Sequence, residues 1–191
     1  IGISGCSRQK EEKLTKYDTQ FFELFDTVTS VTGYARDEKT FQSYVDVFYD
    51  ELKEYHQLYD IYNDYEGINN IKTINDHAGI EPVEVDDKII QMLEEAVDIY
   101  ELTDGNMNVA MGSVLSIWHE YREAGLKHPE QAQLPPQEEL EEAAKHMDIR
   151  KMVIDPEKKT VYLEDPDMSL DVGAIAKGYA AEMASRKVEE A

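Results

Sequence analysis

Residues 170–179, LDVGAIAKGY, carry the clearest chemical pattern in the chain. An apolar stretch meets the carboxylate of Asp171, Gly173 allows a turn, and the residues after it begin a predicted helix. The free N–H groups and the dipole of a helix N-terminus attract anions, and Lys177, about one turn into the helix, adds a positive charge. The pattern predicts a phosphate-binding site, although a glycine turn followed by a solvated lysine explains the spacing equally well.

A second polar cluster, TDGNMN at 103–108, follows a predicted helix end. Asn106 and Asn108 could hydrogen-bond to a base edge, a ribose or a flavin ring, but an ordinary Asx-rich turn has the same composition. The chain contains neither the GxxxxGK[ST] phosphate loop nor the GxGxxG dinucleotide fingerprint. Two Asp-rich stretches, 104–108 and 165–171, lack the glycine and glutamate of an EF-hand, which excludes that type of calcium site.

The histidines do not form a metal-binding or nucleophilic motif. They are scattered along the chain, and each is predicted to be a surface or core residue rather than a catalytic one: His56, His77, His119, His128 and His146. The sequence also lacks a nucleophile elbow and an HExxH motif. Trp118 stands at helical spacing with Leu115 and Tyr121, which predicts a core position rather than a stacking platform.

The elements that must position these residues are a mixture of helices and strands. Apolar spacing predicts a helix from Asp37 to about Tyr62, and three more follow, one capped by Asp86, one ending near Gly125 and one opened by Pro136. A last helix follows Gly173 and is still running at Ala191. Strands or hairpins are predicted at 21–34, 151–163 and 169–172, a short extended segment at 107–111, and a loop with one apolar turn at 63–79. The fold class is therefore α+β.

Charge and composition limit the possible functions. The chain has 191 residues, and 19 Lys+Arg against 41 Asp+Glu give a net charge of −22. A hydrophobic content of 41% and twelve tyrosines indicate a folded domain rather than a disordered acidic chain. Nucleic acid is excluded as a partner because such binding requires Lys and Arg to displace counterions from phosphates. A single cysteine excludes an internal disulfide and a Cys-based zinc site.

That cysteine, Cys6, stands in a short motif of its own. Residues 3–6, ISGC, resemble the lipobox of bacterial lipoproteins, in which the cysteine takes the lipid, and the polar stretch 7–16 follows as a tether would. An arbitrary SGC is the alternative, because the basic and apolar parts of a signal peptide are not in this chain. The lipobox interpretation predicts an extracytoplasmic protein that is anchored to the cell membrane through Cys6.

Taken in order, the motifs closely resemble the FAD:protein FMN transferase (ApbE) family, formerly called thiamine biosynthesis lipoproteins. The matching stretches are FDT at 25–27, LYDIY at 58–62, IN at 74–75, TDGNMN at 103–108 continuing into SVLSIW at 113–118, and LDVGAIAKGY at 170–179. The combination of the last two is specific to the family. The resemblance implies an ApbE-like domain over 19–191 whose C-terminal half is absent from this chain, preceded by a lipoprotein tether at 1–18.

The resemblance also implies a ligand and its contacts. It would place seven residues against FAD: Phe25, Tyr62, Asn106, Met107, Asn108, Asp171 and Lys177. It would place the main-chain oxygen of Ala174 on Mg²⁺. The first motif is often Met-Gly-Thr in the family, and here only the threonine is kept. The family's second half, with a further glycine-rich turn, a histidine segment and an Asp/Thr pair for the metal, has no counterpart in these residues.

The implied reaction is Mg²⁺-dependent transfer of FMN from FAD to a Thr or Ser hydroxyl of an acceptor flavoprotein, with release of AMP. The acceptors of the family are usually subunits of respiratory ion-translocating complexes. A protein of net charge −22 that binds a dianionic cofactor needs Lys177, a helix N-terminus and a divalent cation to neutralise the phosphates. Two alternatives share the motifs: an FAD hydrolase that gives FMN and AMP, and a lipid-anchored flavin-binding protein without catalysis. No residue is assigned as the catalytic base.

Overall fold

The structure, a computed structural model, describes residues 13–191. Cys6 and the lipobox lie outside them, so the lipid anchor stays a prediction. The helices are α1 (Glu38–Leu58), α2 (Ile71–Asp76), α3 (Asp87–Leu102), α4 (Gly112–Lys127), α5 (Gln137–Ala143) and α6 (Ala176–Glu189). The strands are β1 (Thr15–Phe21), β2 (Thr29–Ala35), β3 (Val83–Glu84), β4 (Met152–Asp155) and β5 (Thr160–Leu163). Helices with two small antiparallel sheets confirm the α+β prediction.

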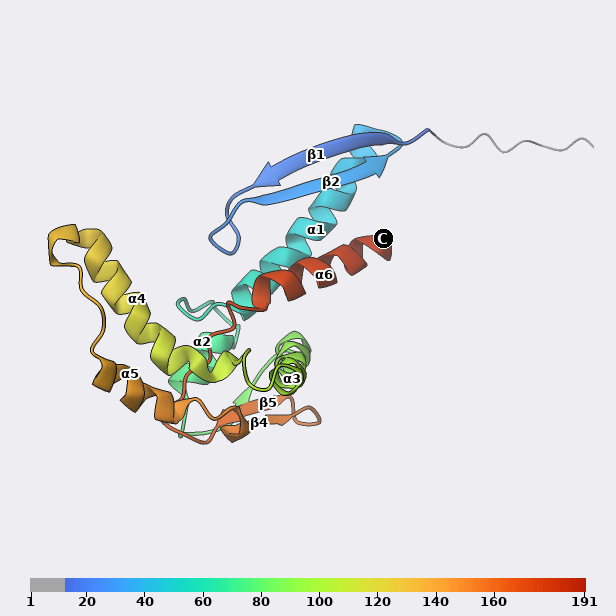
Figure 1. Cartoon of the computed structure of the whole chain (residues 1–191). Coiled ribbons are helices and arrows are strands. Elements are labelled where there is room, and N and C mark those ends of the chain that lie inside the picture. The colour runs from blue at the N-terminus through green and yellow to red at the C-terminus, as the bar shows by residue number, and fades with distance from the viewer. Residues whose placement is uncertain (1–12) are drawn as a thin grey trace, which may run out of the picture.

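The β1–β2 hairpin forms one end of the molecule and lies across the first part of α1 (Figure 1). Its strands pair antiparallel from Thr15 opposite Ala35 to Phe21 opposite Thr29. The Tyr17 ring stacks on Phe41 of α1 with a centroid distance of 5.5 Å, which ties the hairpin to the helix. The predicted strand or hairpin at 21–34 covers β2, whereas β1 begins at Thr15, so residues 15–18 of the predicted tether are strand.

Local capping explains where α1 and α3 begin. Asp37 Oδ1 accepts a hydrogen bond from Thr40 N at 2.8 Å, and Asp86, as predicted, accepts from Lys88 N at 2.8 Å to start α3. The α1 helix ends at Leu58, four residues before the predicted end at Tyr62.

Helix α6 packs along α1, and its buried residues are alanines spaced by four, Ala176, Ala180 and Ala184. Small residues on one face let two helices approach closely, so α6 joins the core without large side chains. It ends at Glu189, two residues before the predicted end.

The second sheet lies at the other end of the core, beside α3 (Figure 1). Its order is β3-β5-β4, and the predicted hairpin at 151–163 is confirmed with Met152 opposite Leu163. The predicted strand at 169–172 is wrong, because the Asn75 side chain and the Val109 carbonyl, rather than a neighbouring strand, bind its backbone. The predicted extended segment at 107–111 is also wrong, because Asn108 caps a short 3₁₀ helix, Val109–Met111.

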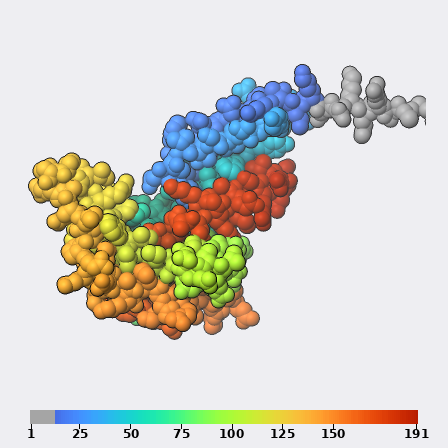
Figure 2. Space-filling view, viewed as in Figure 1, coloured from blue at the N-terminus to red at the C-terminus, as the bar shows by residue number. Residues whose placement is uncertain are grey.

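Helices α4 and α5 form an arm that projects from the rest of the molecule (Figures 1 and 2). Short 3₁₀ helices at Pro129–Gln131, Ala144–His146 and Ile149–Lys151 lie in the connections on either side of α5. Trp118 on α4 is 42% exposed and Leu115 is 37% exposed, so the predicted core position of Trp118 is wrong. The α4 helix packs on α5 along one side only, which leaves the Trp118 face open. In residues 13–191, no helix combines the length and the apolar character that a bilayer crossing requires.

Candidate functional site

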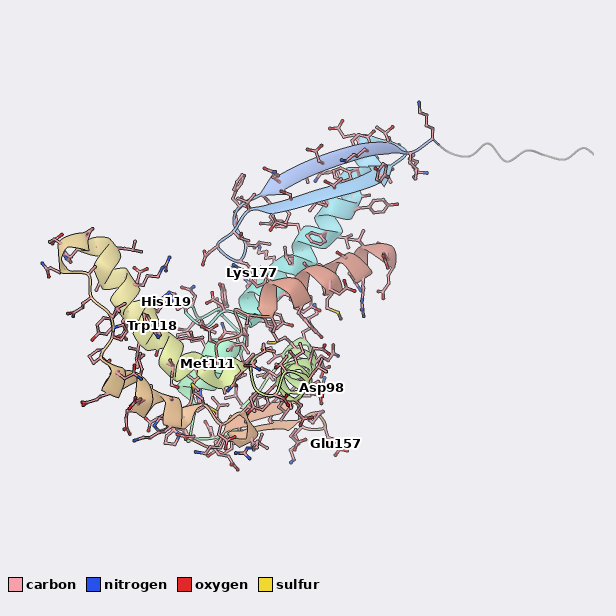
Figure 3. All side chains as sticks on the ribbon, viewed as in Figure 1. Asp98, Met111, Trp118, His119, Glu157 and Lys177 are labelled. Carbon is pink, nitrogen blue, oxygen red and sulfur yellow. The ribbon has the colours of Figure 1, made fainter. Side chains whose placement is uncertain are left out.

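Two adjoining cavities lie where the hairpin loop, the end of α1, α4 and the start of α6 come together. The larger, about 640 Å³, and the smaller, about 320 Å³, fall in the size range of sites for small molecules. Their common wall consists of Ile61, Tyr62, His119, Glu123 and Asp171. Figure 2 shows the surface hollowed between the hairpin and the α4 arm, and Figure 3 shows Lys177 of α6 and His119 of α4 coming from two different helices toward this region.

Asp171 is positioned by a segment that has no secondary structure of its own. The Asn75 side chain forms two hydrogen bonds with the backbone of buried Leu170. It accepts one from the Leu170 N–H at 2.7 Å and donates one to the Leu170 carbonyl at 3.0 Å. Asp171 N then donates to Val109 O at 2.8 Å. The Asp171 Oδ1 atom accepts from Gly173 N at 2.9 Å, which makes the turn into α6. The carboxylate is therefore held at the wall of both cavities by its neighbours on either side.

A close backbone approach fixes the same segment against α4. Gly112 N donates to Ser169 O at 2.9 Å. A Cβ at Gly112 would lie only 2.5 Å from that oxygen, so glycine is required at the first residue of α4. The sequence pattern around SVLSIW does not reveal this requirement, because it depends on a residue 57 positions away.

Lys177 stands at the beginning of α6 and lines the larger cavity. No side chain caps this helix start, and Ala176 N donates to Val172 O at 2.9 Å. Within residues 13–191, the N–H groups of Lys177 and Gly178 are therefore the ones open to a ligand. In the part of the chain that the structure describes, Lys177 forms no ion pair, whereas most of the other described lysines and arginines do. Its charge is thus available to an anion that enters the cavity.

Tyr62 is held by a turn that is built on the carboxylate of Asp60, a residue only 9% exposed. Asp60 Oδ1 accepts from Tyr62 N at 2.7 Å, and Oδ2 accepts from the Tyr65 hydroxyl at 2.7 Å. Burial raises the pKa of Asp60, but hydrogen bonds from Asn63, Tyr62 and Tyr65 outweigh it, so the pKa falls below its usual value. Asp60 therefore stays ionised and holds the turn together, and both of its carboxylate oxygens accept hydrogen bonds from residues of that turn.

The Tyr62 ring itself lies on the wall between the cavities. Its hydroxyl oxygen is 3.3 Å from His119 Nε2, and the two rings are tilted by 32° with a centroid distance of 5.5 Å. Burial and the nearby carboxylates, first Asp171, then Asp60 and Asp26, raise the pKa of Tyr62, and the positive charge of Arg122 opposes them. Tyr62 is therefore a neutral aromatic surface within electrostatic reach of three carboxylates and Arg122.

Phe25 and Asp26 enter the larger cavity from the hairpin loop in a strained backbone. Their φ values are 54° and 50°, the left-handed region that glycine adopts without cost. The Phe25 N–H donates to His56 Nδ1 at 3.3 Å, and the two rings meet edge to face, which stabilises the conformation. The glycine that the family often has in this motif fits the positive φ at Asp26. Such strain is typical of functional loops.

Asn106, Met107 and Asn108 are not among the residues that line either cavity. Asn106 Nδ2 donates to Thr103 O at 2.7 Å, and Met107 N donates to the Thr103 hydroxyl at 3.1 Å. Asn108 donates to Met147 O at 2.9 Å and caps the following 3₁₀ helix. These bonds are those of the Asx-rich turn, and a flavin contact by the three residues stays a prediction.

Sequence reasoning missed three residues of the larger cavity: His56, His119 and Arg122. The two histidines were predicted to be surface or core residues without a role in a site. Leu115, His119 and Arg122 recur at helical spacing, which marks one face of α4, but nothing in the sequence says that this face borders a cavity. The partners that reveal it, Tyr62 and Asp171, are distant in the chain.

One group of potential metal ligands occurs in the described residues, and it lies outside both cavities: His146, Asp165 and Asp167. His146 Nδ1 is 2.9 Å from Asp165 Oδ1, and Lys151 Nζ donates to Asp165 Oδ2 at 2.6 Å. The hydrogen bond from Lys151 lowers the pKa of Asp165 to about 2. Because both oxygens of Asp165 already have partners, the group is an ion-pair network.

The Ala174 carbonyl is the predicted metal ligand. The structure places Ala174 in the turn between Gly173 and α6, exposed and next to residues that line the larger cavity. From residues 13–191, no backbone N–H donates to this carbonyl, because Ile175 and Ala176 both donate to Val172 O and Tyr179 donates to Ile175 O. A carbonyl oxygen of an exposed residue that accepts no backbone N–H suits a hard cation such as Mg²⁺.

Comparison with known proteins links this arrangement to a family. The sequence profile of the ApbE family matches residues 25–191. An FAD:protein FMN transferase of Chlamydia pneumoniae is 21% identical over 183 residues, which are 95% of this chain and 53% of that protein. One of Treponema pallidum is 32% identical over 117 residues, which are 59% of this chain and 30% of that protein.

Solved structures show the same fold. The ApbE protein of Thermotoga maritima aligns with a TM-score of 0.75 at 25% identity, over 92% of this chain and 53% of that one. The flavin transferase ApbE of Vibrio cholerae aligns with a TM-score of 0.72 at 18% identity, over 93% of this chain and 54% of that one. The chain therefore spans about half the length of the first of these curated relatives and of both solved structures.

Proposed function

The chain belongs to the ApbE family, and from this membership we propose that it carries the FAD-binding part of an FAD:protein FMN transferase. The proposed reaction moves FMN from FAD to a Thr or Ser hydroxyl of an acceptor flavoprotein and releases AMP. Relatives in that family are named as transferases of FMN from FAD to protein, which supports the transfer itself.

One observation carries the proposal. Phe25, Tyr62, Asp171 and Lys177 come from segments up to about 150 positions apart, yet all four line the larger cavity. These are four of the seven residues that the family resemblance assigns to FAD. The cavity adds the two properties that a dinucleotide needs, an aromatic surface at Tyr62 and a positive charge at Lys177 beside an open helix start.

In the proposed reaction, the acceptor hydroxyl oxygen bonds to the FMN-side phosphorus and its proton is released to solvent. The bond from this phosphorus to the bridging oxygen breaks, and AMP leaves with that oxygen. Phosphoryl transfer depends mainly on positioning and charge stabilisation. Lys177 and the first N–H groups of α6 bind phosphate oxygens, and Tyr62, fixed by Asp60 and His119, orients the aromatic part. The smaller cavity beside Tyr62 adds an apolar wall from Leu115 and Ile61.

Magnesium is part of the proposal because an acidic protein must neutralise a pyrophosphate. The Ala174 carbonyl and the Asp171 carboxylate would hold the ion, which needs oxygen ligands and keeps several from water and phosphate. When bound, Mg²⁺ supplies charge neutralisation of the phosphate oxygens. The chain's own residues hold the cofactor and keep Asp171 in place through Gly173 and Val109.

The cellular setting is also proposed. An acceptor flavoprotein, such as a subunit of a respiratory ion-translocating complex, would meet the enzyme at the outer face of the cell membrane, to which lipidated Cys6 would anchor it. Replacing Cys6 with serine should release the protein from the membrane fraction of the source cells. Equal membrane association of both forms would contradict the anchor.

The deciding experiment incubates the protein with FAD, Mg²⁺ and an FMN-acceptor domain. Flavin fluorescence that stays with the acceptor through denaturing gel electrophoresis supports transfer. Free FMN and AMP without a labelled acceptor would instead indicate FAD hydrolysis. FAD binding that is independent of Mg²⁺ and yields no product would indicate a non-catalytic binding protein.

Two substitutions test the cavity. Lys177→Gln removes the positive charge, and Asp171→Asn removes the negative charge while its side-chain oxygen can still accept from Gly173 N. Both should weaken FAD binding at least tenfold, the size expected for a charge-assisted contact. Lys187→Gln on the same helix is the control, because Lys187 lines no part of the cavity. Wild-type binding in both test variants would contradict the assignment.

A further inference from the structure

Arg122 is the other arginine or lysine of the larger cavity, and nothing in the family motifs includes it. It projects from α4, whereas Lys177 projects from α6, so the two charges come from different walls. The nearest carboxylate to its guanidinium is that of the neighbouring Glu123, at 3.9 Å, and the Arg122 side chain is 64% exposed. A separation of 3.9 Å between exposed groups is a weak ion pair. The guanidinium is therefore available to a ligand.

Among the described residues, no carboxylate of the cavity other than that of Glu123 lies within ion-pair distance of Arg122. Asp60 is saturated by hydrogen bonds from its own turn, and Asp171 Oδ1 is taken by Gly173 N. His119, one turn before Arg122, is engaged with the Tyr62 hydroxyl. The charge of Arg122 nevertheless acts on the Tyr62 hydroxyl. Burial and the nearby carboxylates raise the pKa of Tyr62, and Arg122 opposes that rise. An anion beside Tyr62 would thus lie within reach of Arg122.

The protein surrounds this cavity with a net charge of −22, which repels anions over long distances. A dianionic ligand needs more than one positive group to overcome that repulsion. Arg122 on α4 and Lys177 on α6 line the same cavity, and neither has an ion-pair partner closer than 3.9 Å among residues 13–191, so together they satisfy this need. Arginine suits the task because its planar fork can donate two parallel hydrogen bonds to phosphate oxygens.

We propose that Arg122 binds the phosphate oxygens of the dinucleotide from the α4 wall, opposite Lys177, so that the pyrophosphate is held between the two helices. This inference rests on the proposed function. It makes the projecting α4 helix a part of the binding site. It also predicts that Arg122 acts through charge and not through packing.

The test measures FAD affinity by flavin fluorescence in the wild-type protein and in Arg122→Gln, each at 10 mM and 500 mM NaCl. Lys127→Gln is the matched control. Lys127 lies on the same helix at the same 3.9 Å from a Glu123 oxygen, but it does not line the cavity. The control therefore reproduces the loss of a positive charge next to Glu123 without removing a charge from the cavity.

We expect Arg122→Gln to weaken FAD binding about tenfold at 10 mM NaCl and about two- to threefold at 500 mM, because salt screens an exposed charge. Arg122→Lys should recover part of the affinity, and Lys127→Gln should stay within twofold of the wild type. A loss of the same size at both salt concentrations, or an equal loss in Lys127→Gln, would overturn the inference.

Failure of the inference and failure of the proposed function give different results. Wild-type affinity in Arg122→Gln together with weak binding in Lys177→Gln would refute the role of Arg122 alone. No measurable FAD binding by the wild-type protein would refute both.

Discussion

Asn75 connects the core to the candidate site, and its replacement by alanine tests that connection. Its side chain accepts from Leu170 N at 2.7 Å and donates to Leu170 O at 3.0 Å, across 95 positions of sequence. Leu170 is 0% exposed, so water cannot take over either bond. The next residue is Asp171, which lines both cavities. Loss of the side chain should therefore affect stability and ligand binding together.

The size of the effect follows from the two backbone groups that Asn75→Ala leaves without a partner. Each buried unsatisfied group costs about 1–3 kcal/mol, and local relaxation recovers part of the sum. We expect the free energy of unfolding to fall by about 3 kcal/mol. For a domain of this size, that corresponds to a fall in Tm of about 6–12 °C. The free energy of unfolding of a folded domain is about 5–15 kcal/mol in total, so the variant should still fold.

The assay is urea unfolding followed by circular dichroism, with Asn69→Ala as the control. Asn69 is an exposed asparagine close to Asn75 in sequence, and it makes one bond, from Nδ2 to Glu84 O at 2.8 Å. Its replacement should cost less than about 1 kcal/mol. FAD titration of the folded Asn75→Ala protein should show weaker binding, because Asp171 is no longer held. An equal loss in the free energy of unfolding in both variants would contradict the inference that the two Asn75–Leu170 hydrogen bonds connect the core to the site.

Three further predictions concern other parts of the structure. The pKa of Asp165 is about 2 in the folded protein and 3.8 in the unfolded chain, so the ionised carboxylate stabilises the folded state above pH 4. Urea unfolding at pH 2–5 should show this stabilisation disappear as the pH falls to 2. The Asp165→Asn variant should lack the pH-dependent part. Asp26→Gly relieves a φ of 50° and should raise the free energy of unfolding by about 0.5–1 kcal/mol in thermal melts; an unchanged or lower stability would contradict strain at this residue. Gly112→Ala places a Cβ 2.5 Å from Ser169 O and should cost about 1–3 kcal/mol in urea unfolding; no loss would contradict the close approach.

The starts of α1 and α3 and the hairpin at 151–163 could be predicted from the sequence because local interactions set them. Asp37 and Asp86 cap their helices with their own side chains, and the hairpin at 151–163 pairs residues that are close in the chain. The predictions failed where a distant partner decides the conformation. Residues 169–172 have the composition of a strand, but Asn75 and Val109 take the backbone bonds that a neighbouring strand would need.

The site shows the same division. The sequence by itself determined the α+β class, the family and the chemical type of the cofactor-binding residues, because these depend on residue identity and short spacings. Only the tertiary structure decided which of them meet. It brings Phe25, Tyr62, Asp171 and Lys177 to one cavity and leaves Asn106–Asn108 in a turn outside it.

His119 and Arg122 are the clearest case of what only the fold decides. Their types and spacing on α4 are those of an ordinary solvent-exposed helix face, and the sequence predicted no role for His119. They enter the site because Gly112 packs against Ser169 and so sets α4 beside Tyr62 and Asp171. Contacts between residues more than 50 positions apart depend on how whole elements pack, and residue patterns within one element carry no information about that packing.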